Sequence, residues 1–194
     1  AILADGTVTC WGAAADGQLG YGNTTIIGDN ETPADNLSTG GIVQLPGGHT
    51  ASAIDVGFHH VCAVLDDSSL TCWGAGNDAQ LGYGNQFTIG DDETPAANPV
   101  SGGIVQLPGG QPVLSVTAGH GHTCALLGDA SLACWGNGGN GQLGYGNTHI
   151  IGDDETPVAN PVNGGAVPLP GGQTAVAVAA ADSYTCAILD GGQT

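Results

Sequence analysis

The chain contains no lysine and no arginine among its 194 residues, whereas 18 residues are aspartate or glutamate, and its formal net charge is −18. Without cationic side chains a protein cannot neutralise phosphates and release their counterions, so no nucleic-acid partner is expected and anionic membrane surfaces are disfavoured. Repulsion between the carboxylates acts against the fold at neutral pH unless screening, bound cations or low pH relieves it.

Long apolar runs are also missing. No stretch of about 18 apolar residues occurs, so no membrane insertion is expected. Aromatic residues make up only 5% of the chain, and 36 residues are glycine. This composition is typical of short strands joined by tight turns rather than of helices. The chain starts at Ala1 with neither methionine nor a signal peptide, so we expect any targeting segment to have been removed or to lie outside this sequence.

What is present is a repeat with a period of 62 residues. The tripeptide Cys-Trp-Gly recurs without a gap, and a second set of cysteines repeats the same spacing, at 10–12, 72–74 and 134–136 and at Cys62, Cys124 and Cys186. A fixed period of this length indicates an array of one supersecondary unit. In such an array we expect the shared residues to build the scaffold and the varied ones to carry recognition.

The period divides one continuous repeat domain into a partial terminal strand at 1–9 and repeats at 10–71, 72–133 and 134–194. Within one repeat, four short segments have strand character: 103–107, 114–118, 122–127 and 132–135. The remainder of that repeat, 136–165, is rich in Gly, Asn, Asp and Pro and is expected to form a long loop. The fold class is therefore all-β, with about four antiparallel strands per repeat.

The cysteine spacing predicts disulfides. If Cys62 and Cys72 face each other in a hairpin, Val64 faces Leu70, and all four side chains share one face of the hairpin. Opposite residues at such a site lie within disulfide range. We predict the bonds Cys62–Cys72 and Cys124–Cys134, each contributing about 3 kcal/mol. Reduced, buried thiols are the alternative, and zinc is disfavoured because the spacing lacks close cysteine pairs. Disulfides predict an oxidising setting, extracellular or at the cell surface.

These segments resemble a known family. His-Thr-Cys-Ala-Leu-Leu at 122–127, Cys-Trp-Gly at 134–136 and Gly-Gln-Leu-Gly-Tyr-Gly at 141–146 resemble the repeat of the regulator of chromosome condensation. The likeness is greatest to secreted bacterial versions that carry Cys-Trp-Gly and Ile-Gly-Asp-Asp-Glu-Thr-Pro. It implies a β-propeller in which each repeat amounts to one four-stranded blade, usually seven around a ring, so this chain holds about three blades plus a partial strand.

The resemblance predicts the fold of this chain better than its function. The founding member is a nucleotide-exchange factor that docks on chromatin, but this chain has no arginine and no basic tail to match it. Other bacterial relatives use the propeller face as a protein-binding platform, including one that inhibits β-lactamases. Fold alone therefore does not settle function.

Both ends of the chain depart from a closed propeller, because three blades cannot close a ring. Residues 187–194 reprise residues 1–8, and neither Cys10 nor Cys186 has its expected hairpin partner within the chain. We expect these two cysteines to bond to a neighbouring repeat or to another copy. The sequence is then either a window from a longer array or a unit that joins end to end into a ring or fibre.

Three acidic loops are the best ligand candidates. Clustered carboxylates among carbonyl-rich loops suit Ca²⁺, the one cofactor that we consider. A turn-forming role through Asx hydrogen bonds is the favoured interpretation. The candidate calcium-binding residues are Asp29, Glu31, Asp91, Asp92, Glu93, Asp153, Asp154 and Glu155.

Histidine and tryptophan recur at fixed positions. The pairs His59-His60 and His120-Gly-His122 correspond to Asp182-Ser183-Tyr184 in the third repeat. Because His, His and Tyr alternate there, an amphipathic ring with a hydrogen bond is favoured over a metal ligand. The three tryptophans are expected to pack between blades: Trp11, Trp73 and Trp135.

The first long loop holds three Asn-x-Ser/Thr acceptors for N-glycosylation, Asn23, Asn30 and Asn36, whose counterparts in the other repeats do not fit the pattern. No catalytic set stands out, and no enzyme activity is expected. The sequence favours a non-catalytic extracellular structural protein, a disulfide-pinned scaffold that assembles head to tail with copies of itself or flanking repeats. The alternative is a fragment of a secreted propeller that binds a protein or a glycan.

Overall fold

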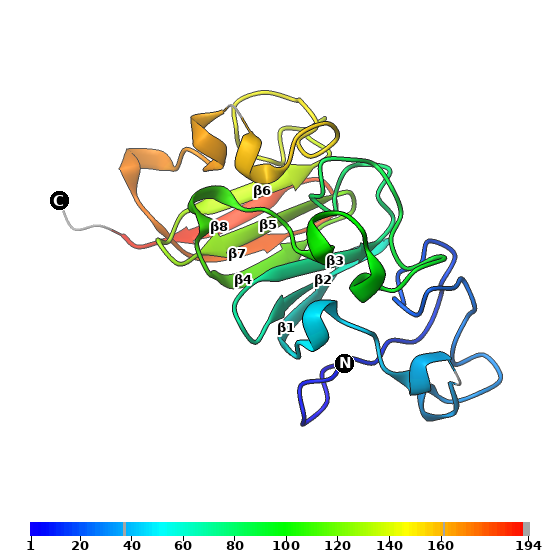
Figure 1. The fold of residues 1–194 in the computed structure, drawn as a ribbon. Coiled ribbons are helices and arrows are strands. Elements are labelled where there is room, and N and C mark those ends of the chain that lie inside the picture. Colours follow the sequence, from blue (N-terminus) through cyan, green and yellow to red (C-terminus); the bar gives the residue numbers. More distant parts are fainter. Residues whose placement is uncertain (37, 161, 192–194) are drawn as a thin grey trace.

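A computed structural model describes residues 1–36, 38–160 and 162–191, and shows an all-β chain of three antiparallel sheets (Figure 1). The sheets contain β1 (Ala51–Val56), β2 (His60–Leu65) and β3 (Leu70–Gly74); β4 (Val113–Ala118), β5 (His122–Leu127) and β6 (Leu132–Gly136); and β7 (Ala175–Ala180) and β8 (Thr185–Leu189). Among the described residues, the only helices are 3₁₀ turns: Pro33–Asp35, Ser38–Gly41, Pro46–Gly48, Pro95–Ala97, Ser101–Gly103, Pro108–Gly110, Pro157–Ala159, Asn163–Gly165 and Pro170–Gly172. Within that part of the chain, none is long and apolar enough to cross a membrane.

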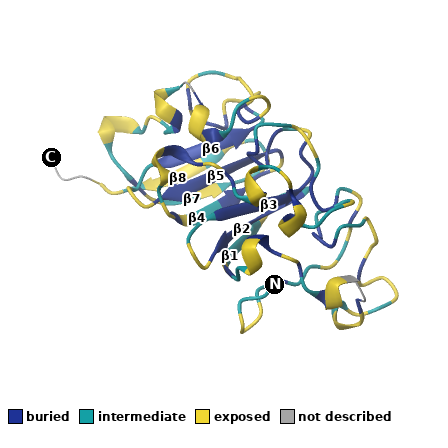
Figure 2. Ribbon diagram, viewed as in Figure 1, coloured by how far each residue is buried: buried dark blue, intermediate teal, exposed yellow. Residues whose placement is uncertain are grey.

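The hairpin of β2 and β3 has the register expected from the cysteines. Cys62 faces Cys72 and Val64 faces Leu70, and the two cysteines are bonded, with a Cα–Cα distance of 4.1 Å. The same geometry recurs at Cys124–Cys134. Because neighbouring sheets and loops cover them, β2 and β3 are buried along their whole length (Figure 2).

The expected strand at 103–107 does not form, and blades of four strands are not observed. The segment is extended, but a single backbone hydrogen bond joins it to β3, from Val105 N to Leu70 O (2.9 Å). A 3₁₀ turn lies on each side of it, Ser101–Gly103 and Pro108–Gly110. Pro108 lacks an N–H, and the glycines beside it have positive φ, so the ladder cannot lengthen. The first two sheets therefore have three strands each, and this short segment lies beside β3, the third strand of the first sheet.

Consecutive sheets pack face to face. β4 lies against β1 and β2, and β7 lies against β4 and β5. The same position links the innermost strands of each pair: Asp55 Oδ2 accepts from Ala118 N (2.7 Å), and Thr117 Oγ1 accepts from Ala180 N (2.9 Å). One hydrophobic core runs through the first two sheets and the loops that follow them. This stacking fixes which side chains meet at the joints and which remain on the rim.

Candidate functional site: joints, loops and rim

The tryptophans of β3 and β6 lie in the joints between repeats. Trp73 Nε1 donates to Gln18 O (3.0 Å) and Trp135 Nε1 donates to Gln80 O (2.9 Å), and both side chains are fully buried. A Cβ at Gly82 would lie 2.7 Å from Trp135 Nε1, so glycine is needed for this close approach. The packing role expected for the tryptophans fits these two. Trp11 departs from it, because its side chain is 54% exposed.

His60 and His122 also belong to the joints. His60 Nε2 lies 2.9 Å from Thr123 Oγ1, which in turn donates to Gln80 O. Burial, above all, lowers the pKa of His60 to about 3, so the ring is neutral. His122 makes the same contact with Thr185 at 2.9 Å. This is the hydrogen-bonded ring expected from the sequence. Tyr184 departs from it, since its side chain is 62% exposed.

The tyrosines of the Gly-Tyr-Gly segments have a role that sequence reasoning missed. The Tyr83 hydroxyl accepts from Cys72 N and lies 3.0 Å from both Cys72 O and Gly103 O. Tyr21 and Tyr145 make the equivalent contacts in their own repeats. Each hydroxyl joins the Cys-Trp-Gly strand to the far end of the long loop. Tyrosine recurs at the same position of each repeat, and this recurrence could have predicted a structural role from the sequence.

Two of the three acidic loops gather their carboxylates. Asp91, Asp92 and Glu93 each place one carboxylate oxygen within 4.8 Å of the others, and so do Asp153, Asp154 and Glu155. Partial burial is the main cause that raises the pKa of Glu93 and of Glu155 to about 7, and the neighbouring aspartates add to it. Clusters of this kind can hold Ca²⁺, which stays a prediction.

The first acidic loop differs. No such group forms there among the described residues, and Glu31 Oε1 instead accepts from Gly28 N (3.3 Å). Asn30 stands where the other repeats have aspartate. Asp29 and Glu31 are therefore weaker candidates than their counterparts.

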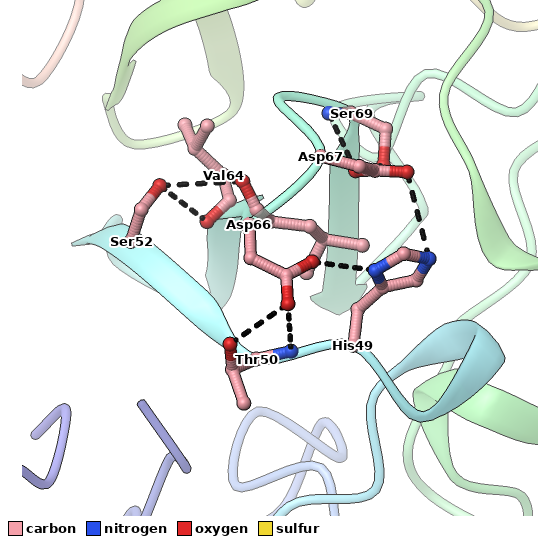
Figure 3. Close-up of polar contacts among 8 residues, drawn as sticks. His49, Thr50, Ser52, Val64, Asp66, Asp67 and Ser69 are labelled. Carbon is pink, nitrogen blue, oxygen red and sulfur yellow. Dashed lines mark hydrogen bonds and ion pairs between the residues drawn. The ribbon is translucent and has the colours of Figure 1, made fainter. Parts of the chain in front are cut away.

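A histidine that the sequence did not single out lies between two carboxylates (Figure 3). His49 Nδ1 lies 2.5 Å from Asp66 Oδ1, and Nε2 lies 3.5 Å from Asp67 Oδ2. Thr50 Oγ1 donates to the other oxygen of Asp66 (3.0 Å). The hydrogen bond with Asp66 is the main cause that raises the pKa of His49. Because both ring nitrogens of His49 face carboxylates, we interpret these contacts as ion pairs that hold the turn before β1 against the β2–β3 turn.

Five exposed or half-exposed side chains from adjacent repeats form what we call the rim cluster: Asp16, Phe58, His59, His120 and Asp182. The rings of Phe58 and His120 are stacked, with centroids 4.4 Å apart, and His59 meets Phe58 edge-on at 4.5 Å. His59 Nδ1 lies 2.8 Å from Asp16 Oδ2, and His120 Nδ1 lies 2.9 Å from Asp182 Oδ1. Phe58 was not anticipated from the sequence.

The cysteines near the two ends are not bonded to any described residue. Cys10 is half-buried and Cys186 is exposed, and burial raises the pKa of the Cys10 thiol. Their expected bonds to a neighbouring repeat or copy stay predictions.

The three glycosylation candidates differ in exposure. Asn30 is exposed, whereas Asn23 is half-buried and its Nδ2 donates to Tyr21 O (3.3 Å). Asn36 is only 5% exposed, so the loop would have to open to admit a glycan at this residue. Leu37, the middle residue of that acceptor, lies outside the described residues.

Comparisons with known proteins agree on one family. Residues 69–126 match the description "Regulator of chromosome condensation (RCC1) repeat", and residues 113–142 match a second form of it. The chain is 32% identical over 143 residues to the ultraviolet-B receptor UVR8 of Arabidopsis thaliana, covering 73% of this chain and 28% of that protein. It is 28% identical over 159 residues to the probable E3 ubiquitin-protein ligase HERC6 of Homo sapiens, covering 82% and 14%.

Solved structures resemble the fold. Human WBSCR16 superposes with a TM-score of 0.65 at 19% identity, covering 97% of this chain and 41% of that one. Prp20p from Saccharomyces cerevisiae, whose structure is described with its binding to Gsp1p and histones, gives a TM-score of 0.64 at 16% identity, covering 96% and 40%. The chain thus spans less than half the length of each of these relatives. On the matched repeats and the shared fold, it is composed of RCC1-like repeats and belongs to the family of the regulator of chromosome condensation.

Proposed function

We propose that this chain is a non-catalytic segment of an RCC1-like propeller that binds other proteins through its rim. The proposal rests on where shared and varied positions lie: residues that the repeats share are buried in the scaffold, and residues that differ between repeats lie on the exposed rim. Residues repeated at the same phase, such as Trp73, Tyr83 and His60, are used inside the scaffold. The rim cluster lies where the repeats differ, because Phe58, His120 and Asp182 are equivalent positions with three different side chains.

Cross-linking with mass spectrometry on a purified complex tests this proposal. Cross-links from a bound partner should concentrate on the β1–β2, β4–β5 and β7–β8 turns, and Phe58→Asp should reduce them. Phe87→Asp is the matched control, since Phe87 is 69% exposed on a different loop. Cross-links gathered on the acidic loops, or equal effects of the two variants, would contradict the proposal.

A second function, a structural scaffold that extends head to tail, is favoured by the groove beside β8. The groove has a volume of about 380 Å³ and is lined by Gln142 and Gly144, the equivalents of the residues that receive Trp73 and Trp135. We propose that a Cys-Trp-Gly strand, from a flanking repeat or a second copy, occupies it. Sedimentation of the chain across concentrations tests whether a second copy supplies this strand. Association that Trp11→Ala abolishes would support a second copy, and a discrete monomer at every concentration would contradict it.

The same proposal covers location. The bonds Cys62–Cys72 and Cys124–Cys134 favour an oxidising compartment, and so an extracellular or cell-surface protein. N-glycosylation, if the host performs it, is proposed for the exposed Asn30 and for the half-buried Asn23. Peptide mapping of protein from its native source checks both, through the oxidation state of the cysteines and the mass of the loop peptides.

A further inference from the structure

The rim cluster leaves an aromatic face and two carboxylates open to solvent. Phe58 is 66% exposed, although His120 stacks on it. A hollow of about 300 Å³ runs along the turns of adjacent repeats, and Phe58, His120 and Asp182 line it. Asp182 is 75% exposed at its edge. A carboxylate offers about four acceptor sites, and among the described residues His120 and Ser183 are the ones with a side-chain hydrogen bond to this carboxylate.

We propose that the rim cluster binds an arginine side chain of a basic protein partner, holding it at neutral pH and releasing it on mild acidification. The inference rests on the protein-binding function proposed above and names its partner chemistry. A guanidinium stacks on an aromatic ring and pairs with a carboxylate at the same time. The hollow offers both, the ring of Phe58 and the carboxylate of Asp182.

Charge complementarity selects a cationic occupant. The chain carries a formal charge of −18 with no lysine or arginine, so its field attracts basic partners. Asp16 and Asp182 are the carboxylates of the cluster itself. Two further carboxylates contact the same turns: Asp78 lies against Gly121, and Asp55 accepts a hydrogen bond from Ala118 N.

Histidine protonation supplies the release. Histidine as a residue type gains a positive charge on mild acidification, and in the rim cluster a histidine contacts each of the two carboxylates that would attract the guanidinium. His59 Nδ1 lies 2.8 Å from Asp16 and His120 Nδ1 lies 2.9 Å from Asp182, so positive charge gained on these rings would neutralise the carboxylates that hold the arginine. Of the other rings nearby, burial lowers the pKa of His60 to about 3, so His60 stays neutral over this range, and burial also lowers the pKa of His122.

The two phenylalanines of the chain provide a direct test. NMR of the ring-labelled protein gives one set of signals for Phe58 and one for Phe87, an internal control. The probes are the peptide acetyl-Gly-Arg-Gly-amide and the same peptide with neutral citrulline. We expect saturable shifts of the Phe58 signals with the arginine peptide at about pH 7.5, and affinity about three- to five-fold weaker at about pH 5.5.

Variants separate the parts of the proposal. Asp182→Asn should weaken binding at neutral pH, and His59→Gln with His120→Gln should keep binding at low pH. Equal shifts of Phe58 and Phe87, or equal binding of the citrulline peptide, would overturn the arginine assignment. Stronger binding at low pH would overturn the release. If a protein partner still cross-links to the rim while the arginine peptide does not bind, the protein-binding function stands and only the partner chemistry fails.

Discussion

At the scale of single residues, the Tyr83 hydroxyl gives the sharpest prediction. It satisfies Cys72 N and lies 3.0 Å from Gly103 O in a fully buried position. Tyr83→Phe removes these partners and leaves buried backbone groups unsatisfied, so the free energy of unfolding should fall by about 1–3 kcal/mol. Urea denaturation measures it. Tyr184→Phe is the matched control, because its exposed ring should tolerate the change without measurable loss.

Tryptophan offers a second comparison within the same chain. Trp135→Phe removes the hydrogen bond to Gln80 O and part of a fully buried side chain, so we expect a loss of about 1–3 kcal/mol. Trp11→Phe should cost little, because the Trp11 side chain is largely exposed. Denaturation midpoints of the two variants check this, and equal losses would show that burial in the joint is not the cause.

At the scale of elements, the hairpins depend on their disulfides. The Cys62→Ala, Cys72→Ala double variant opens a bond that closes a short loop, and the free energy of unfolding should fall by about 3 kcal/mol. Cys186→Ser is the control, since its thiol is exposed and not bonded to any described residue. Thermal unfolding of both variants, with and without reductant, measures the difference. If the protein without the bond kept its full stability, the hairpin would be held by packing alone.

The hairpins were also the elements that the sequence predicted best. A period of two and a cysteine spacing are local signals, and they placed Cys62 opposite Cys72 and Val64 opposite Leu70. The segment 103–107 was wrongly expected to form a strand because its apolar pattern is extended. Whether a strand pairs depends on its neighbours, and here Pro108 and the flanking 3₁₀ turns prevent it. The rim cluster was missed for a related reason: Phe58 meets His120 only after two repeats stack.

At the scale of the whole molecule, acidity acts on the repeat joints and the acidic loops in opposite directions. The folded pKa of His60 is about 3, below its ordinary value, so the unfolded chain binds more protons as the pH falls through about 6.5. Acidification therefore weakens the joints. Glu93 and Glu155 have folded pKa values raised to about 7, so the native chain binds their protons first, and the same acidification stabilises the loops.

The double variant Glu93→Gln, Glu155→Gln separates these effects. It removes the loop carboxyls, so its stability should fall more steeply than that of the parent chain between about pH 7 and pH 5, because the protonation of Glu93 and Glu155 then no longer opposes the effect of His60. Adding His60→Gln, which keeps a donor for Thr123 Oγ1, should flatten the slope again. Urea midpoints across the pH range measure all three proteins. A slope that the loop variant leaves unchanged would show that Glu93 and Glu155 titrate as ordinary surface carboxyls, and the joints alone would then set the pH dependence of the array.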